Sequence, residues 1–122
     1  MNNRMWNIKN PYQGDSTKVL CVCSAGLLRS PTLAKILGEE PFNCNTRSAG
    51  IDVDHALIPV DEALVAWADI IFCMNAHQKE LLLSNHKSLV GAEVMVLDVP
   101  DNFSFMQPEL VTILKDKVAK YF

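Results

Sequence analysis

Short apolar runs alternate with amphipathic stretches along this chain. Runs rich in β-branched and other apolar residues, bounded by polar or turn-forming ones, are typical of buried strands. Four such runs are present, at residues 18–23, 42–48, 69–74 and 93–99, and the second is the weakest. Apolar residues at helical spacing follow each run. The pattern therefore predicts four strands, each followed by a helix.

Local signals mark the expected ends of these helices. Asn75 with Gln78 three residues later has the form of a capping box, and proline suits the first turn of a helix. Pro41 ends the first expected helix. The expected starts are Ser30 as N-cap before Pro31, Asp61 as N-cap, Asn75 with Gln78, and Pro108.

Alternation of strand and helix predicts an α/β fold with a four-stranded parallel sheet and helices on both faces. In such sheets, ligands bind beyond the carboxyl ends of the strands, where the helices begin. The segment after the first strand, which follows Cys23, is therefore the expected place of a site.

Composition narrows the class of protein. The 122 residues, 49% of them hydrophobic, fit one domain at 17–122, preceded by a polar extension at 1–16. The net charge is -3, from 11 basic and 14 acidic residues, without a polybasic run, so neither a nucleic-acid nor a membrane partner is expected. No apolar run approaches the ~20 residues of a membrane span, and the first residues lack an apolar signal core. The expected compartment is the cytoplasm; no pattern indicates an oligomeric state.

The loop after the first strand has the features of an anion site. Its residues are Ser24, Ala25, Gly26, Leu27 and Leu28, and Arg29 follows them. Backbone N–H groups in a tight turn at a helix N-terminus form a nest that binds phosphate. A guanidinium adds a planar fork that matches two phosphate oxygens. We therefore expect residues 24–29 to bind a phosphate group.

Cys23 lies directly before this nest. A positive field favours the thiolate form of a cysteine, and a thiolate beneath a bound phosphate is a nucleophile aimed at phosphorus. Ser30 can donate a hydrogen bond to that sulfur and can stabilise it as a leaving group. The motif Cys21-x-Cys23 lacks the usual C-x2-C spacing and has no histidine pair after it, so no metal site is expected.

The stretch "VCSAGLLRSP" resembles the phosphate loop of the low-molecular-weight protein tyrosine phosphatases, which share their fold with a class of arsenate reductases. The segments "TRSAGI", "IPVDEALVAWADIIFCMNAHQKEL" and "LDVPDNF" also resemble parts of that family. The resemblance covers residues 18–122. It implies a fold like that of these phosphatases, with the cysteine at the end of the first strand.

The resemblance implies a phosphomonoester hydrolase that needs no metal or cofactor and acts on a phosphorylated protein, most often at phosphotyrosine, or on a small aryl phosphate. Cys23 would attack phosphorus and form a phosphocysteine, with Arg29 stabilising the phosphate oxygens. Asp101, favoured over Asp98, would be the general acid. His55 and Phe103 would line the substrate pocket.

The loop departs from the family pattern at two places. Ala25-Gly26 stands where the family usually has Gly-Asn, so the hydrogen bonds of that asparagine side chain are missing. Leu28 stands where many members have a second cysteine, so a disulfide within the loop is impossible. Cys21 is then either a substitute disulfide partner or a buried thiol, and the sequence favours the buried thiol.

Two other functions compete with the hydrolase. An arsenate reductase of this fold needs relay cysteines, and although Cys73 matches one of them, Glu80 occupies the place of the next. Cys73 is therefore interpreted as a core thiol. The other rival is a non-catalytic module that binds phosphate or a phosphoprotein, for which the cysteine would not be required.

Overall fold

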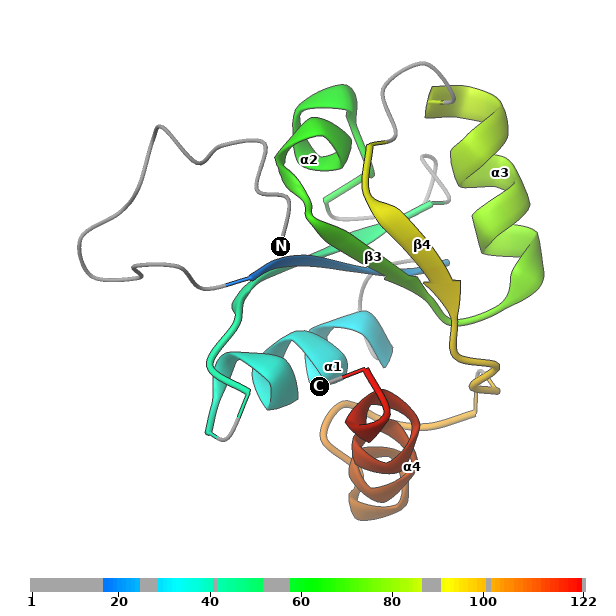
Figure 1. Cartoon of the computed structure of the whole chain (residues 1–122). Coiled ribbons are helices and arrows are strands. Elements are labelled where there is room, and N and C mark those ends of the chain that lie inside the picture. Colours follow the sequence, from blue (N-terminus) through cyan, green and yellow to red (C-terminus); the bar gives the residue numbers. More distant parts are fainter. Residues whose placement is uncertain are drawn as a thin grey trace.

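The computed structural model describes residues 17–24, 29–40, 42–51, 58–86, 91–100 and 102–121 (Figure 1). Strands and helices alternate as predicted, and the α/β fold class is confirmed. The elements are β1 (Lys18–Cys23), α1 (Arg29–Gly38), β2 (Asn45–Gly50), α2 (Glu62–Trp67), β3 (Ile70–Cys73), α3 (Ala76–His86), β4 (Glu93–Val96) and α4 (Pro108–Ala119). The predicted extension, residues 1–16, lies outside the described residues.

The four strands form one parallel sheet in the order β2-β1-β3-β4. Figure 1 shows α1 and α4 on one face of this sheet and α2 and α3 on the other. Successive side chains of a strand point to opposite faces, and those of β1 join both cores. Cys21 and Cys23 belong to the cluster under α1 and α4, whereas Leu20 and Val22 belong to the cluster under α2 and α3. Burial on both faces explains the continuous apolar run of β1.

The order of the strands creates a topological switch point at the carboxyl end of the sheet. From β1 the chain crosses to β2 on one side, and it then returns to β3 on the other side of β1. Ligand sites of doubly wound sheets lie at such a reversal, between the two strands that diverge. Cys23 ends β1 and Cys73 ends β3, so the loop after Cys23 follows β1 at this switch point.

Two predicted boundaries in the first half of the chain are wrong. The first helix begins at Arg29, so Ser30 lies inside it and is not its N-cap. The second strand begins at Asn45 rather than at residue 42, because the preceding residues close α1 instead. Phe42 N and Asn43 N both donate to Glu39 O at 3.0 Å, and Asn43 has a left-handed φ of 52°.

The last strand ends at Val96, three residues earlier than predicted. Asp98 has a φ of 55°, and this left-handed residue turns the backbone out of the extended conformation. The chain nevertheless stays beside the end of β3, since Leu97 N donates to Cys73 O at 2.9 Å and Val99 N to Met74 O at 2.8 Å. The segment after β4 is therefore fastened at the switch point.

Other predicted helix signals are confirmed. Leu64 N donates to Asp61 Oδ1 at 2.8 Å, so Asp61 caps α2. Asn75 and Gln78 form the capping box, with Gln78 N donating to Asn75 Oδ1 at 2.9 Å and Asn75 N donating to Gln78 Oε1 at 3.2 Å. Pro108 opens α4. Among the described residues, no helix has the length and apolar character needed to cross a membrane.

Candidate active site

Cys23 lies at the switch point, where it pairs with β2. It is the last residue of β1, only 3% of it is exposed, and its carbonyl accepts a hydrogen bond of 2.9 Å from Ile51 N. Its Sγ lies 3.1 Å from Ser30 Oγ. Ser30 is fully buried in the first turn of α1, so its hydroxyl lies against the sulfur instead of capping the helix. This geometry allows the hydroxyl to donate to a thiolate, the role predicted for Ser30.

Arg29 opens α1 and is 2% exposed. Its Nη1 donates a hydrogen bond of 2.8 Å to Val99 O, in the segment that follows β4. Because a guanidinium carries five N–H donors, an arginine can hold a carbonyl and still present a fork to a phosphate. The arginine of the predicted phosphate loop is thus tied to the segment that contains both candidate acids.

A second contact fastens that segment farther along the chain. Met106 N donates to Thr32 Oγ1 at 2.9 Å, and Thr32 is fully buried in α1. Val99 and Met106 are therefore both attached to the helix that carries Arg29, one on each side of position 101. Phe103, between them, packs against the cluster that includes Cys23. The predicted place of Phe103 near the pocket stays a prediction.

Of the two candidate acids, the structure describes only Asp98. Asp101 lies outside the described residues. Asp98 is exposed, and among the described residues no hydrogen bond to its carboxylate is present. The predicted last strand, at residues 93–99, includes Asp98. Asp98 lies instead beyond β4, in the left-handed conformation, so its expected place in the strand is wrong.

Gln78 is a buried residue that the sequence indicated only as part of the capping box. Its Nε2 donates to Ser24 Oγ at 3.3 Å, and its Oε1 accepts from Met74 N at 2.7 Å. Ser24 is the first residue of the predicted phosphate loop. The side chain of Gln78 therefore bridges the end of β3 and that loop, a contact between residues 54 positions apart that no sequence signal indicated.

The structure brings four of the predicted site residues together. These are Cys23, Ser24, Arg29 and Ser30, at the carboxyl end of β1 and in the first turn of α1. Other predicted residues lie outside the described part of the chain, and their roles stay predictions: Ala25, Gly26, Leu27, Leu28, His55 and Asp101.

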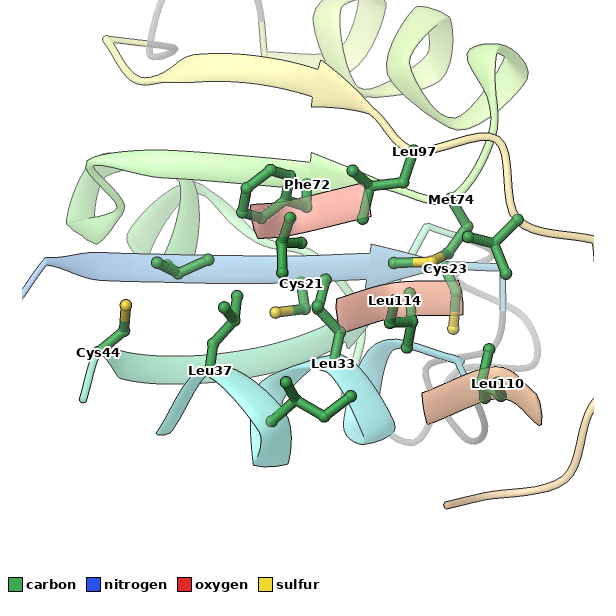
Figure 2. Close-up of a cluster of buried hydrophobic side chains, with 14 residues drawn as sticks. Cys21, Cys23, Leu33, Leu37, Cys44, Phe72, Met74, Leu97, Leu110 and Leu114 are labelled. Carbon is green, nitrogen blue, oxygen red and sulfur yellow. The ribbon is translucent and has the colours of Figure 1, made fainter. Parts of the chain in front are cut away.

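The remaining thiols, those of Cys21, Cys44 and Cys73, are buried. Figure 2 shows Cys21 among leucines of α1, with Cys23 at the far end of β1 near Met74. Burial raises the pKa of Cys21 well above its usual value, and the neighbouring Cys44 and Cys23 raise this pKa further. Burial also raises the pKa of Cys73 to about 12. Cys21 and Cys73 are therefore neutral thiols near neutral pH.

Geometry argues against a disulfide between Cys21 and Cys23. Both are free, and they are two residues apart on the same face of β1. Residues at this spacing in a strand are about 6.6 Å apart, whereas a disulfide needs Cβ atoms about 3.8 Å apart. The bond would require β1 to buckle. Of the two alternatives for Cys21, the structure favours the buried thiol.

We expect Cys21 and Cys73 to resist alkylation by iodoacetamide at pH 8 while the protein is folded. The thiolate is the reactive form, and a thiol with a pKa of about 12 is ionised to only about one part in 10⁴ at that pH. Peptide mapping by mass spectrometry would measure the modification, with guanidinium-unfolded protein as the control in which all four thiols react. Rapid modification of Cys73 in the folded protein would contradict the prediction.

No model of a protein family and no curated protein sequence matches the chain. Solved structures do match. Wzb of Vibrio vulnificus in complex with benzylphosphonate is 18% identical, with a TM-score of 0.70 over 86% of this chain and 96% of that one. A Cys-to-Ser mutant of the arginine phosphatase YwlE, with a phosphorylated active-site serine, is 23% identical, with a TM-score of 0.66 over 86% of this chain and 95% of that one.

A low-molecular-weight protein tyrosine phosphatase from Bacillus subtilis is 22% identical, with a TM-score of 0.61 over 85% of this chain and 98% of that one. These similarities extend over nearly the full length of each neighbour. The chain therefore has the fold of the low-molecular-weight protein tyrosine phosphatases.

Proposed function

We propose that the protein is a metal-free phosphomonoester hydrolase that uses Cys23 as nucleophile, and that its substrate is phosphotyrosine in a protein or a small aryl phosphate. The observation that carries the proposal is the placement of Cys23 Sγ 3.1 Å from Ser30 Oγ, directly before a helix that opens on Arg29, at the switch point of the sheet. A buried thiol, a hydroxyl and a guanidinium at this place suit attack on a bound phosphate.

In the first step the substrate phosphate binds to Arg29 and to the backbone amides of the loop. The sulfur of Cys23 attacks phosphorus in line, the bond from phosphorus to the ester oxygen breaks, and Asp101 gives its proton to the departing oxygen. The product is a phosphocysteine. Arg29 stabilises the charge on the equatorial oxygens in this step.

In the second step Asp101, now a carboxylate, takes a proton from water as the water attacks phosphorus. The bond from phosphorus to sulfur breaks, inorganic phosphate is released, and Cys23 leaves as a thiolate. A hydrogen bond from Ser30 Oγ stabilises the sulfur as it leaves. The enzyme thereby returns to its starting state without a metal or a redox partner.

An aromatic leaving group is favoured by Phe103, which is partly buried on the segment that also holds the candidate acids. A phenyl side chain at a pocket wall can stack on a phosphorylated ring. Because one structural neighbour is an arginine phosphatase, phosphoarginine is the alternative substrate to be measured beside phosphotyrosine.

The arsenate reductase rival is disfavoured by the position of Cys73. In the register of β1 and β3, Cys73 pairs with Val22, and both face α2 and α3. Cys23 faces α1 and α4 on the other side of the sheet. A disulfide relay from Cys23 to Cys73 would therefore have to pass through the sheet.

One set of assays tests the proposal against its rivals. Purified protein is offered an aryl phosphate, peptides with phosphotyrosine or phosphoarginine, and arsenate with thioredoxin or glutaredoxin. We expect hydrolysis of the aryl phosphate and the phosphotyrosine peptide, a phosphocysteine at Cys23 after acid quenching, and no arsenate reduction. Phosphate binding without hydrolysis would favour the binding module, and efficient arsenate reduction would favour the reductase.

Asp101→Asn should slow hydrolysis of phosphotyrosine by about 10²–10⁴-fold, the usual contribution of a general acid. The loss should be smaller for an activated aryl phosphate if phosphorylation of Cys23 limits the rate, because a good leaving group needs less help from a proton. One limb of the pH–rate profile should also flatten. Steady-state kinetics on the two substrates across pH would measure both effects.

Asp98→Asn is the matched control for this variant. It makes the same chemical change three residues earlier, at an exposed side chain, and should leave the rates on both substrates close to those of the wild type. A catalytic loss confined to Asp98→Asn would show that Asp98 is the acid. Thermal melts of both variants would separate a loss of chemistry from a loss of folded protein.

A further inference from the structure

We propose that Gln78 is a positioning residue that holds Ser24, and through Ser24 the first turn of the phosphate loop, in its binding conformation. This inference rests on the function proposed above. It names a residue that lies outside the loop and is needed for that function. Gln78 is 1% exposed, and every polar atom of its side chain has a partner.

The contacts of Gln78 determine how its amide is oriented. Met74 N donates to Oε1 at 2.7 Å, and Asn75 N donates to the same oxygen at 3.2 Å. Two backbone donors require an acceptor, so the oxygen of the amide faces the end of β3 and the nitrogen faces the other way. Nε2 is thereby directed to Ser24 Oγ, 3.3 Å away, and donates to it.

The position of Gln78 lets it connect two strands at the switch point. Its backbone belongs to the first turn of α3, directly after β3, whereas Ser24 directly follows the nucleophile at the end of β1. The side chain therefore connects the carboxyl ends of β1 and β3, the two central strands. The hydrogen bond from Gln78 to Ser24 is partly buried, and partial exclusion of water strengthens it and restricts the side chain of Ser24.

The sequence of the loop explains why a contact from outside it would matter. The loop has Ala25-Gly26, and neither residue has a polar side chain that could make hydrogen bonds within the loop. Gly26 permits a wide range of backbone conformations, so the loop gains from restraint by a residue outside it. Gln78 supplies one such restraint at Ser24, and Ser30 and Arg29 lie at the other end of the loop.

A substitution that removes only the donor tests the proposal. Gln78→Glu retains an oxygen for Met74 N and Asn75 N, and so retains the capping box, but it cannot donate to Ser24 Oγ; it can only accept from that hydroxyl, and it places a negative charge beside the loop. Gln78→Met removes the donor without adding a negative charge, but it also removes the oxygen that accepts from Met74 N and Asn75 N, so only a loss shared by both variants is assigned to the bond with Ser24. We expect both variants to lose about 10–100-fold in kcat/KM on an aryl phosphate, as a displacement of about 1 Å in a positioned group would give. Their affinity for inorganic phosphate, measured by calorimetry, should also fall.

A double-mutant cycle with Ser24→Ala identifies the path of the effect. If Gln78 acts through Ser24, adding Gln78→Met to Ser24→Ala should cost far less than Gln78→Met costs alone, in kcat/KM and in phosphate affinity. Asn75→Ala is the stability control. It removes the cap of α3 and should lower the melting temperature, but it leaves the side chain of Gln78 in place and should retain the wild-type kcat/KM below the melting transition.

The two proposals fail in different ways. If the wild type hydrolyses no phosphomonoester but binds phosphate, and the variants bind it more weakly with coupling to Ser24, the proposed function is wrong and the role of Gln78 stands. If the wild type is an active phosphatase and both Gln78 variants match it in kcat/KM and phosphate affinity, the role of Gln78 is overturned. Purely additive effects of Gln78→Met and Ser24→Ala would also overturn it.

Discussion

Cys23→Ser should abolish turnover of phosphomonoesters while leaving phosphate binding largely intact. The serine hydroxyl is a much weaker nucleophile than a thiolate, and loss of a covalent nucleophile costs about 10⁴-fold or more in kcat. Arg29 and the loop backbone, which would bind the phosphate, are unchanged. Calorimetry with phosphate or vanadate, beside an aryl phosphatase assay, would measure the two properties separately.

The same chemical change at another thiol provides the control. Cys44→Ser alters a free cysteine directly before β2, at the amino end of the sheet, and should retain the wild-type rate. Substantial hydrolysis by Cys23→Ser would show that Cys23 is not the nucleophile. Loss of both turnover and phosphate binding, with a lowered melting temperature, would show instead that the contact with Ser30 is needed for folding.

Arg29→Lys should lower kcat/KM by about 10²–10³-fold, as removal of one transition-state donor does, although the positive charge is retained. An ammonium group cannot form the bidentate fork on two phosphate oxygens. An ammonium group also cannot donate to Val99 O and bind a phosphate in a fixed geometry at the same time. The bond to Val99 matters because it ties Arg29 to the segment that carries the candidate acids. Steady-state kinetics and phosphate titration would record the loss.

Arg47→Lys is the matched control, since Arg47 is an exposed arginine whose guanidinium lies 5.1 Å from the ring centroid of Trp67. It should retain the wild-type kcat/KM. Thermal melts of both variants are needed, because Arg29 is buried and its replacement can also destabilise the fold. A near-normal rate in Arg29→Lys would mean that Arg29 is structural.

The elements could be predicted because their signals are local. The buried run of β1, the cap at Asp61 and the capping box at Asn75 each depend on neighbours in the sequence, and all three are confirmed. Three element ends were wrong: the start of α1, the start of β2 and the end of β4. Near the last two ends a residue adopts a left-handed φ, which the pattern of apolar residues does not indicate. Asn43 closes α1 rather than extending β2, and Asp98 turns the chain out of β4.

The candidate site also has a part that the sequence predicts and a part that only the fold reveals. Cys23 and Arg29 were found because they flank one contiguous loop. The bond from Arg29 to Val99 joins residues 70 positions apart, and the contact from Gln78 to Ser24 depends on which strands become neighbours. No spacing rule within a single sequence indicates such pairs. They follow only from the order of the strands.

The distribution of thiols over the sheet determines what an oxidant would do to this protein. A sulfenic acid on Cys23 is protected from further oxidation to the irreversible sulfinic and sulfonic acids when a thiol condenses with it to a disulfide. Cys21 is spaced wrongly along β1, Cys73 faces the opposite side, and Cys44 lies at the other end of the sheet. The fold therefore leaves recovery of an oxidised Cys23 to a thiol from outside the chain, such as glutathione.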